Sequence, residues 1–441
     1  MDRLQQADYD RLVKSLFLKT LCIGLLFLVA CQTDVPDVVV ETAVSTQPPP
    51  TPIQQPTLTP TPSPTPLPTA TVTPEPTATA TTIPTPAFPL YDGTPLDASQ
   101  VGVQIHIHNE DLAAIFEYLE RLNVGWVKVQ VSWKLYQPEP DRFDDYRFGE
   151  LSDMVERANA SNIKVLLSVA KAPEWSRPTT EMDGPPSDYA LYTAFMTHLA
   201  ERYGNTVAAY ELWNEPNLQR EWNGVSLSAA DFVQLVAAGA AGVRAVDSEA
   251  TLISGAPAPT GINDGITAVD DRQYLQEMLQ TGVSNAVDAI GIHPYGWANP
   301  PDSSVHAPDL TIPTHNNHHS FFFRDTYANY QAQLAALSLT NVPLWATEFG
   351  WGSFEGFDAL PPDSVAFMAN VSEWQQAVYT LRAIEMGQTE FGSGPMILWN
   401  LNFGPTLGPR YSESGFSLLR EDGTARPVYL ALENSLQNSG E

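Results

Sequence analysis

The sequence predicts a (β/α)₈ TIM barrel as the one folded domain of the chain, and three observations lead to this fold class. Short apolar, β-branched runs alternate eight times with amphipathic segments across residues 91–441. The runs are apolar along their whole length, as strands are when helices cover both faces of a parallel sheet. The length of this stretch, roughly 350 residues, suits an eight-unit barrel with moderate loop insertions.

The strands are predicted where apolar runs end in polar residues. They are 101–107, 126–133, 164–170, 208–213, 251–255, 289–292, 343–347 and 396–399. A doubly wound open sheet is the competing architecture. It would place a Gly-rich phosphate-binding turn directly after the first strand, and the residues around 101–108 contain no such turn. The sequence therefore favours the closed barrel.

Helices are predicted between the strands from apolar residues three or four apart. The segment 188–203 is typical, with Ser187 expected as its N-cap and Gly204 as its stop. The others are 111–122, 151–160, 229–246, 324–337, 371–386 and a last helix that begins near Pro427. Polar residues collect after the strands, which is where barrel enzymes carry their chemistry.

The chain begins with a segment that predicts export. Four basic residues precede an apolar run at 21–30, which has the length of a signal-peptide core and is short for a lone membrane span. The run ends Leu-Val-Ala-Cys at Cys31, which resembles a bacterial lipobox. The resemblance implies removal of a signal peptide, residues 1–30, and lipidation of Cys31. A secretory signal or signal anchor that happens to contain Cys is the alternative.

Residues 31–90 predict a disordered linker. Between residues 32 and 90 there are 16 prolines and 16 threonines, with no Lys, Arg or Gly. Such a segment cannot bury apolar surface and favours polyproline II, so we expect a semi-rigid stalk between the anchor and the domain at 91–441. The expected location is the outer surface of a bacterial membrane.

Overall composition excludes several function classes. The chain has 51 acidic and 22 basic residues, a formal net charge of −29, which would repel a nucleic-acid backbone. Its two cysteines lie within the first 31 residues, so the domain has neither a disulfide nor a thiolate metal site. We expect no cofactor and a monomer.

Two glutamates follow, or lie at the end of, predicted strands, and each is flanked by tryptophan. Glu215 lies in Trp-Asn-Glu-Pro-Asn after the fourth strand, and Glu348 lies in Thr-Glu-Phe-Gly-Trp at the end of the seventh. The ends of these strands face each other across a barrel mouth, so the carboxylates are expected to converge. Glycoside cleavage needs such a pair, one carboxyl to protonate the leaving oxygen and one to act at the anomeric carbon.

The two motifs, taken with residues on the other strands, resemble the clan A glycoside hydrolases, the retaining barrel glycosidases of the family 5 and family 39 types. The resemblance covers nearly all of residues 95–436. It implies that Glu215 is the acid/base and Glu348 the nucleophile. It also implies that Asn214 bonds the 2-hydroxyl of the reacting sugar.

Other site residues follow from the same resemblance. Tyr295 would orient the nucleophile, and Trp399 would form a platform beneath the sugar. His293 and Lys128 are further candidates near the two carboxylates. Lys128 stands where the clan usually has Arg, so the fork that bonds two acceptors is lost and reduced activity or altered substrate choice is expected. Among the indoles near strand ends, Trp133 and Trp351 are expected to line a sugar-binding groove.

The cluster His315-Asn-Asn-His318-His319 invites a metal interpretation. It lies in a Pro-rich loop, without helical spacing and without acidic residues beside it, so a substrate-facing loop is the favoured interpretation. Glu211, within the fourth strand, is interpreted as structural and paired with a buried base.

These observations predict a lipid-anchored retaining glycosidase that cleaves β-linked oligosaccharides or polysaccharides. Two alternatives stay open. One is a surface glycan-binding lipoprotein with weak or no catalysis, and the other is a transglycosylase. The identity of the glycan, and whether it is cleaved internally or from its end, depend on the loops. The loop sequences do not predict either property.

Overall fold

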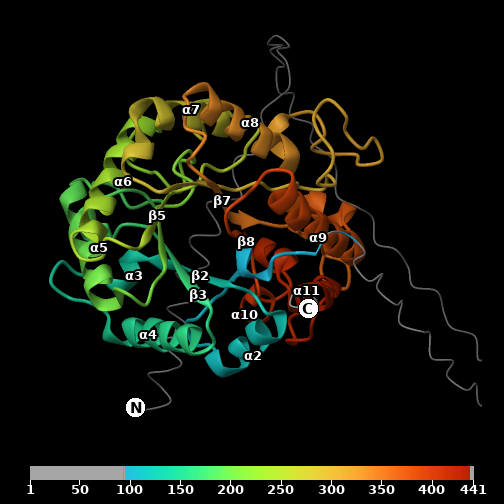
Figure 1. Cartoon of the computed structure of the whole chain (residues 1–441), viewed down its shortest axis with the longest axis horizontal. Coiled ribbons are helices and arrows are strands. Elements are labelled where there is room, and N and C mark those ends of the chain that lie inside the picture. Colours follow the sequence, from blue (N-terminus) through green and yellow to red (C-terminus); the bar gives the residue numbers. More distant parts are fainter. Residues whose placement is uncertain (1–92, 94, 438–441) are drawn as a thin grey trace, which may run out of the picture. The chain divides into compact units, whose positions relative to one another are not determined.

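The computed structural model describes residue 93 and residues 95–437, which Figure 1 shows as strands inside a ring of helices. The expected signal peptide at 1–30, the lipidation site Cys31 and the linker at 31–90 lie outside the described residues. Among the residues that are described, no helix is both long and apolar enough to cross a bilayer.

The strands form a closed parallel barrel, which confirms the predicted fold class. Each strand pairs with the next, and β1 pairs with β8 to close the sheet. The strands are β1 (Val101–Gln104), β2 (Trp126–Ser132), β3 (Lys164–Ala170), β4 (Ala209–Leu212), β5 (Thr251–Ser254), β6 (Ala289–Ile292), β7 (Leu344–Phe349) and β8 (Met396–Leu398). All eight lie at the predicted places, with ends that differ by at most three residues.

The helices follow one another around the barrel in chain order (Figure 1). They are α2 (Leu112–Leu122), α3 (Trp133–Tyr136), α4 (Asp145–Ala160), α5 (Tyr189–Tyr203), α6 (Ala229–Arg244), α7 (Asp271–Thr281), α8 (Phe323–Ala336), α9 (Glu373–Thr389), α10 (Phe403–Leu407) and α11 (Pro427–Gln437). Helix α4 begins six residues earlier than expected. Helix α7 has no counterpart among the expected helices.

Side-chain caps explain where several helices begin. Asp144 accepts a hydrogen bond from the backbone N–H of Arg147, which sets the early start of α4. Asp188, one residue after the expected Ser187, caps α5, and Gly204 ends that helix as predicted. A capping box of Ser372 and Gln375 begins α9.

The amino-terminal end of the barrel is closed by apolar side chains. Trp126 and Trp345 meet edge to face, with ring centroids 5.1 Å apart. They belong to a separate buried cluster whose other members come one from each of five strands: Leu166, Ala209, Ile253, Ala289 and Ile397. Because Trp126, Ala209 and Ala289 are the first residues of their strands, this layer plugs the end where the strands begin.

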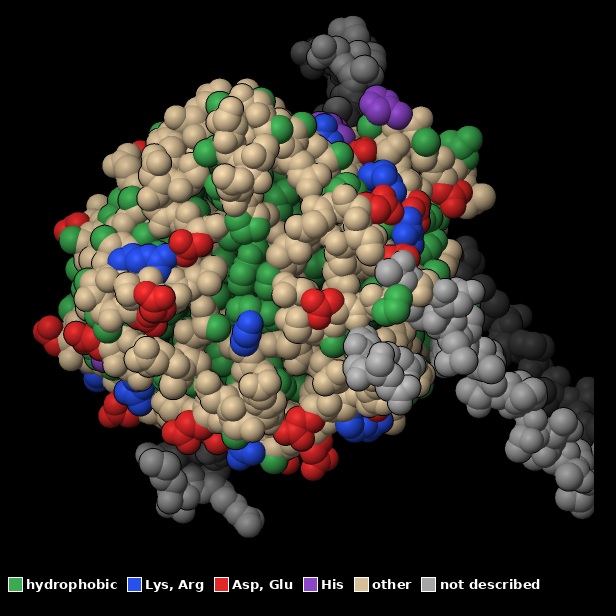
Figure 2. Space-filling model, in the orientation of Figure 1, with side chains coloured by type: hydrophobic (Ala, Val, Ile, Leu, Met, Phe, Trp, Pro, Cys, Tyr) green, Lys and Arg blue, Asp and Glu red, His purple; other side chains and the backbone are tan. Residues whose placement is uncertain are grey.

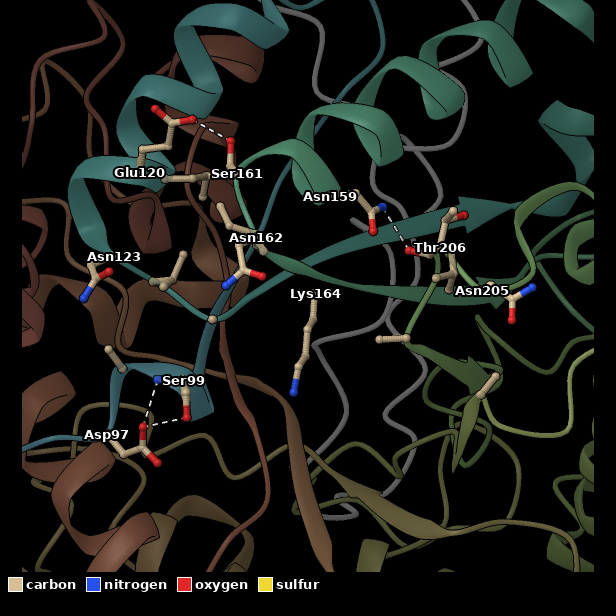
Figure 3. A pocket seen from close by; sticks show the side chains of 18 of the residues that line it. Asp97, Ser99, Glu120, Asn123, Asn159, Ser161, Asn162, Lys164, Asn205 and Thr206 are labelled. Atoms are coloured by element: carbon tan, nitrogen blue, oxygen red, sulfur yellow. Dashed lines mark hydrogen bonds between the residues drawn. The ribbon is translucent and has the colours of Figure 1, made fainter. Parts of the chain in front are cut away.

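A polar cavity of about 970 Å³ lies outside this plug (Figure 3). Asparagines at the connections into β2, β3 and β4 line it, among them Asn123, Asn162 and Asn205. Lys164 reaches across the same region and places its ammonium 5.2 Å from the centre of a Trp126 ring. This cavity is therefore remote from the two glutamates, which lie where the strands end.

Charged and apolar side chains are distributed unevenly over the surface. Figure 2 shows one face of the molecule with a central hollow lined by hydrophobic side chains, while acidic and basic side chains lie mostly toward its edge.

Candidate active site

Glu215 lies in a tight loop that directly follows β4. Trp213 and Glu215 both have left-handed backbone conformations, with φ of 85° and 41°. Such values are rare for residues other than glycine and are concentrated at functional sites. The N–H of Glu215 donates to the carbonyl of Ala256, which follows β5, at 3.1 Å. The loop is thereby tied to the next strand connection.

The Glu215 carboxylate has a different partner on each oxygen. His293 Nδ1 lies 3.2 Å from Oε1, and Arg220 donates to Oε2 at 2.8 Å. The side chain is 11% exposed. Burial alone would raise the pKa of this carboxyl, but the hydrogen bond to His293 and the charge of Arg220 outweigh it and lower the pKa to about 2. Glu215 is therefore ionised in the free protein.

Glu348 is the penultimate residue of β7, and protein donors hold both of its oxygens. Lys128 donates to Oε1 at 3.1 Å, and the Tyr295 hydroxyl donates to Oε2 at 3.2 Å. Burial is the largest of the effects that raise the pKa of Tyr295 well above its ordinary value, so the phenol stays protonated as a donor. The carboxylate is thus oriented from β2 and from the connection after β6.

Lys128 donates two hydrogen bonds and forms a further, buried ion pair. Besides Glu348 it contacts the carbonyl of Thr347 at 3.0 Å and Glu211 Oε2 at 2.9 Å. Lys128 and Glu211 are both fully buried. Burial lowers the pKa of Lys128, but the charges of Glu211 and Glu348 outweigh it and raise that pKa. The missing arginine fork is thus replaced by an ammonium that donates to Glu348 and to the Thr347 carbonyl, and Glu211 has the buried base expected for it.

His293 lies between the carboxylates and is fully buried. Its Nδ1 is 3.2 Å from Glu215 and 3.9 Å from Glu348 Oε2, and its Nε2 is 3.9 Å from Glu211. Burial lowers its pKa, but the neighbouring carboxylates, Glu348 first, outweigh burial and raise it. One oxygen of Glu215 and one of Glu348 lie within 4.8 Å of each other and of a His293 nitrogen.

Trp399 follows β8 beside the two carboxylates and is half-buried. Its ring centroid is 6.3 Å from that of Tyr295 and 5.1 Å from that of Phe416. Gln104, with its amide oriented to satisfy both neighbours, accepts from Trp399 Nε1 at 3.2 Å and donates to Glu348 Oε1 at 3.3 Å. One amide thus links the aromatic wall to the carboxylate.

Asn214, directly before Glu215, is 6% exposed. Its Oδ1 atom is buried and has no hydrogen-bond partner among the described residues. A buried acceptor without a partner costs free energy, and such atoms occur where a ligand supplies the missing bond.

Two of the expected sugar-binding residues do not reach the site. Trp133 is 0% exposed, stacks on Phe195 with centroids 5.1 Å apart, and donates to Gln137. Trp351 is 1% exposed and donates to the carbonyl of Asn299 at 2.8 Å. The expectation that these indoles line a groove is wrong, because both are core residues with satisfied N–H groups.

Sequence reasoning missed three site residues. Gln104 carried a weak signal, as a polar residue at the end of an apolar strand. Phe416 lies in a connection after β8 that showed no pattern. Arg220 also carried no signal, since an exposed loop arginine five residues after a glutamate is ordinary.

The histidine cluster does acquire an acidic partner, contrary to expectation. Asp270, which caps α7, lies 3.1 Å from His319 Nε2 and 3.9 Å from His318 Nε2. The two imidazoles overlap, with centroids 4.1 Å apart and planes 34° apart. His318 Nδ1 also accepts from the N–H of Ser320. One ligand atom each of Asp270, His318 and His319 lie within 4.8 Å of one another, which is close enough to hold a metal ion.

His315 lies apart from that pair. Its ring stacks on Trp297, with centroids 4.6 Å apart and planes 13° apart. The loop that connects β6 to α8 is therefore held at two separate places.

Comparison with solved structures supports the fold. A family 39 glycoside hydrolase from Bacteroides cellulosilyticus WH2 superposes with a TM-score of 0.58 at 20% identity, covering 78% of this chain and 64% of that one. A glucosidase from Croceicoccus marinus gives 0.55 at 16% identity, with 79% and 69% covered. An exo-beta-1,4-mannosidase, Op5Man5, from Opitutaceae bacterium strain TAV5 gives 0.52 at 16%, with 78% and 60% covered. This chain thus spans less than two thirds of the first and third of these proteins.

Comparison of sequences gives the family. No curated protein matches the chain. The model of the family described as cellulase, glycosyl hydrolase family 5, matches residues 91–382, which is well over half of the chain and includes both Glu215 and Glu348. The resemblance drawn from the two glutamate motifs is confirmed, and the chain belongs to glycosyl hydrolase family 5.

Proposed function

We propose that this protein is a retaining glycosidase that hydrolyses β-linked oligosaccharides or polysaccharides by double displacement. The observation that carries the proposal is the pair Glu215 and Glu348, which have oxygens within 4.8 Å of each other and unlike surroundings. Carboxyl groups about 5–5.5 Å apart are typical of retaining enzymes, whereas inverting enzymes separate them by roughly 6.5–9.5 Å. The short separation supports retention.

In the first step, Glu348 attacks the anomeric carbon as the glycosidic C–O bond breaks. Glu215 gives its proton to the departing oxygen, so the leaving sugar departs as a neutral alcohol. Lys128 and Tyr295 hold the nucleophile with one donor on each oxygen. A covalent glycosyl–Glu348 ester and an ionised Glu215 result.

In the second step, Glu215 removes a proton from a water molecule that attacks the same carbon. The ester bond breaks, Glu348 leaves as a carboxylate, and Glu215 ends protonated for the next cycle. Two inversions at one carbon give net retention. The open acceptor of Asn214 suits the 2-hydroxyl of the sugar, and the half-buried face of Trp399 suits its C–H face.

The test is Glu348→Ala, assayed with aryl β-glycosides. Hydrolysis is expected to disappear, and added azide or formate is expected to restore it in part, by filling the space left by the carboxylate. Glu433→Ala, a glutamate of α11 that pairs with Arg121, serves as the matched control. Undiminished hydrolysis by Glu348→Ala would overturn the proposal.

The same assay separates the alternative functions. A glycan-binding protein would retain sugar without releasing product, and a transglycosylase would yield longer glycosides when an acceptor sugar is added. Export and membrane anchoring through Cys31 stay predictions from the sequence.

A further inference from the structure

Arg220 occupies the oxygen of Glu215 that a substrate would need. Since His293 is on Oε1, Oε2 is the remaining oxygen, and Arg220 donates to it at 2.8 Å. The arginine side chain is 66% exposed, whereas that of Glu215 is 11% exposed. The guanidinium on Oε2 is therefore the more exposed partner of this pair.

This contact conflicts with the role of a general acid. A general acid must carry a proton and lie within hydrogen-bond reach of the atom that it protonates. Glu215 Oε2 does neither while it accepts from Arg220, because an adjacent guanidinium favours the ionised carboxylate. Arg220 and the leaving-group oxygen of a substrate compete for the same position.

A second acceptor lies beside the arginine. Glu221 Oε1 is 3.8 Å from Arg220 Nε, and the Glu221 side chain is 12% exposed. Glu221 Oε2 is buried and has no hydrogen-bond partner among the described residues. Rotation of the guanidinium toward Glu221 would supply this oxygen with a donor. The Glu221 carboxylate is therefore an alternative acceptor for Arg220 when Arg220 leaves Glu215.

We propose that Arg220 is a displaceable cap on the acid/base carboxylate. In the free enzyme it bonds Glu215 Oε2, and substrate binding moves it to Glu221, which frees the oxygen to take up a proton and face the leaving group. This inference rests on the proposed function of Glu215 and adds a positioning residue that acts through it.

The charged neighbours of this pair come from several elements. Around Glu215 they are His293 and Tyr295 after β6 and Glu348 of β7, with Lys128 and Glu211 behind His293. Around Arg220 they are Glu221, and Glu413 from the turn Ser412–Phe416, and Lys171 after β3 acts on Glu221. The cap is the member of this group that is mostly exposed.

The proposal predicts a split between two pH profiles. The profile of kcat/KM reports the free enzyme and that of kcat reports the substrate complex. His293 and Arg220 lower the pKa of Glu215 in the free enzyme. Loss of Arg220 raises that pKa, so a larger fraction of Glu215 is protonated at any alkaline pH. The decrease of kcat/KM on the alkaline side then occurs at higher pH. The decrease of kcat on the alkaline side keeps its position.

The experiment compares wild type, Arg220→Ala and Arg220→Lys with an aryl β-glycoside between pH 4 and 9. In Arg220→Ala we expect the alkaline limb of the kcat/KM profile to shift by roughly one pH unit or more toward higher pH. At pH 7, kcat/KM should then be roughly tenfold higher than in wild type. Arg220→Lys should lie in between. Arg157→Ala, which removes an equal charge from α4, is the matched control and should follow wild type.

Two results would overturn the cap. One is a kcat/KM limb that does not move in Arg220→Ala, and the other is an equal shift of both limbs, which a general change of surface charge would cause. Glu221→Gln gives an independent test if Arg220→Ala folds poorly. Without the charge that receives it, Arg220 should stay on Glu215, and kcat should fall. An unchanged kcat in Glu221→Gln argues against the cap.

Failure of the proposed function has a different signature. In Glu215→Ala the kcat/KM profile should have no alkaline limb. Formation of the glycosyl–Glu348 ester should persist only with an activated aryl leaving group. If the limb persists in Glu215→Ala, Glu215 is not the acid, and the function of this residue falls together with the cap. If the limb disappears there and Arg220→Ala changes nothing, only the cap is wrong.

Discussion

The two ends of the barrel bury side chains of opposite character, apolar at one end and ionisable at the other. At the amino-terminal end, Trp126 and Trp345 close the interior with apolar rings. At the carboxyl-terminal end, the interior holds Lys128, Glu211 and His293, three ionisable side chains that are fully buried. Packing of apolar rings needs no particular partner, whereas each buried charge costs free energy unless an opposite charge or donor meets it. The first end serves stability, and the second holds the residues of the proposed reaction.

The backbone shows the same contrast. Left-handed residues at the amino-terminal end include Asn123, Asn162 and Asn205, a residue type that tolerates this conformation. At the carboxyl-terminal end the same conformation is imposed on Trp213 and Glu215. Strain of this kind costs about 1–3 kcal/mol for each residue and persists only where surrounding structure enforces it.

The largest effect is expected from Lys128→Met, which removes the central charge of the carboxyl-terminal end. Glu211 and Glu348 lose their common partner, and Glu348 Oε1 loses its charged donor. A misplacement of about 1 Å can cost roughly 10²-fold in rate, so kcat should fall about that much. Unfolding free energy should fall by about 3–5 kcal/mol.

Lys128→Arg is the matched variant for that prediction. It keeps the charge, and we expect it to recover much of the stability and part of kcat. The measurements are kcat with an aryl β-glycoside and denaturant unfolding. A normal kcat in Lys128→Met would mean that Tyr295 and Gln104 suffice to orient Glu348.

The second prediction concerns Trp345→Ala at the opposite end. Deleting this buried ring should lower the free energy of unfolding by about 3–5 kcal/mol, because a cavity replaces its contacts with Trp126. The kcat and KM of the folded protein should stay at wild-type values. A kcat of Trp345→Ala that falls together with the free energy of unfolding would contradict this separation of the two barrel ends.

The third prediction concerns only the pH dependence of stability, at Asp271, a buried carboxyl that takes no part in the proposed chemistry. Burial raises its pKa to about 7, with the hydrogen bond from Ser320 acting in the opposite direction. The folded state therefore keeps a proton that the unfolded chain releases above its ordinary pKa near 3.8. Stability should fall as pH rises from about 4 to about 7, by at most ~1.4 kcal/mol per pH unit.

Asp271→Asn has no proton to release, so it should lack this part of the decline and gain relative stability at pH 8. Unfolding curves at pH 5 and pH 8 measure the difference, with Asp153→Asn on α4 as an exposed control. Parallel curves for wild type and Asp271→Asn would show that Asp271 does not hold the proton.

Much of the fold could be predicted because strand and helix periods are local properties of the sequence. The eight apolar runs and their polar ends determined the barrel, and therefore the approach of Glu215 to Glu348. Helix α7 was missed although Tyr274, Leu275, Met278 and Leu279 form its buried stripe. Its remaining residues are polar, and the stripe is narrow enough to pass for a loop.

The surroundings of the carboxylates were less predictable, since they depend on side-chain direction and on distant contacts. Trp133 stands beside the predicted site in sequence, yet its place at the start of α3 turns the indole onto Phe195 of α5. Asp270 meets His319 across 49 positions of the chain. Neither the direction of a side chain nor a contact between residues so far apart in sequence can be predicted from the spacing of neighbouring residues.

Asn299 closes the base of the long connection between β6 and α8. Its amide nitrogen donates to the carbonyls of His315 and Phe321 at 2.6 and 3.0 Å. Its own carbonyl accepts from Trp351, three residues after Glu348. Both ends of the segment 300–314 thus meet at one residue, which also anchors the connection that follows the strand of Glu348.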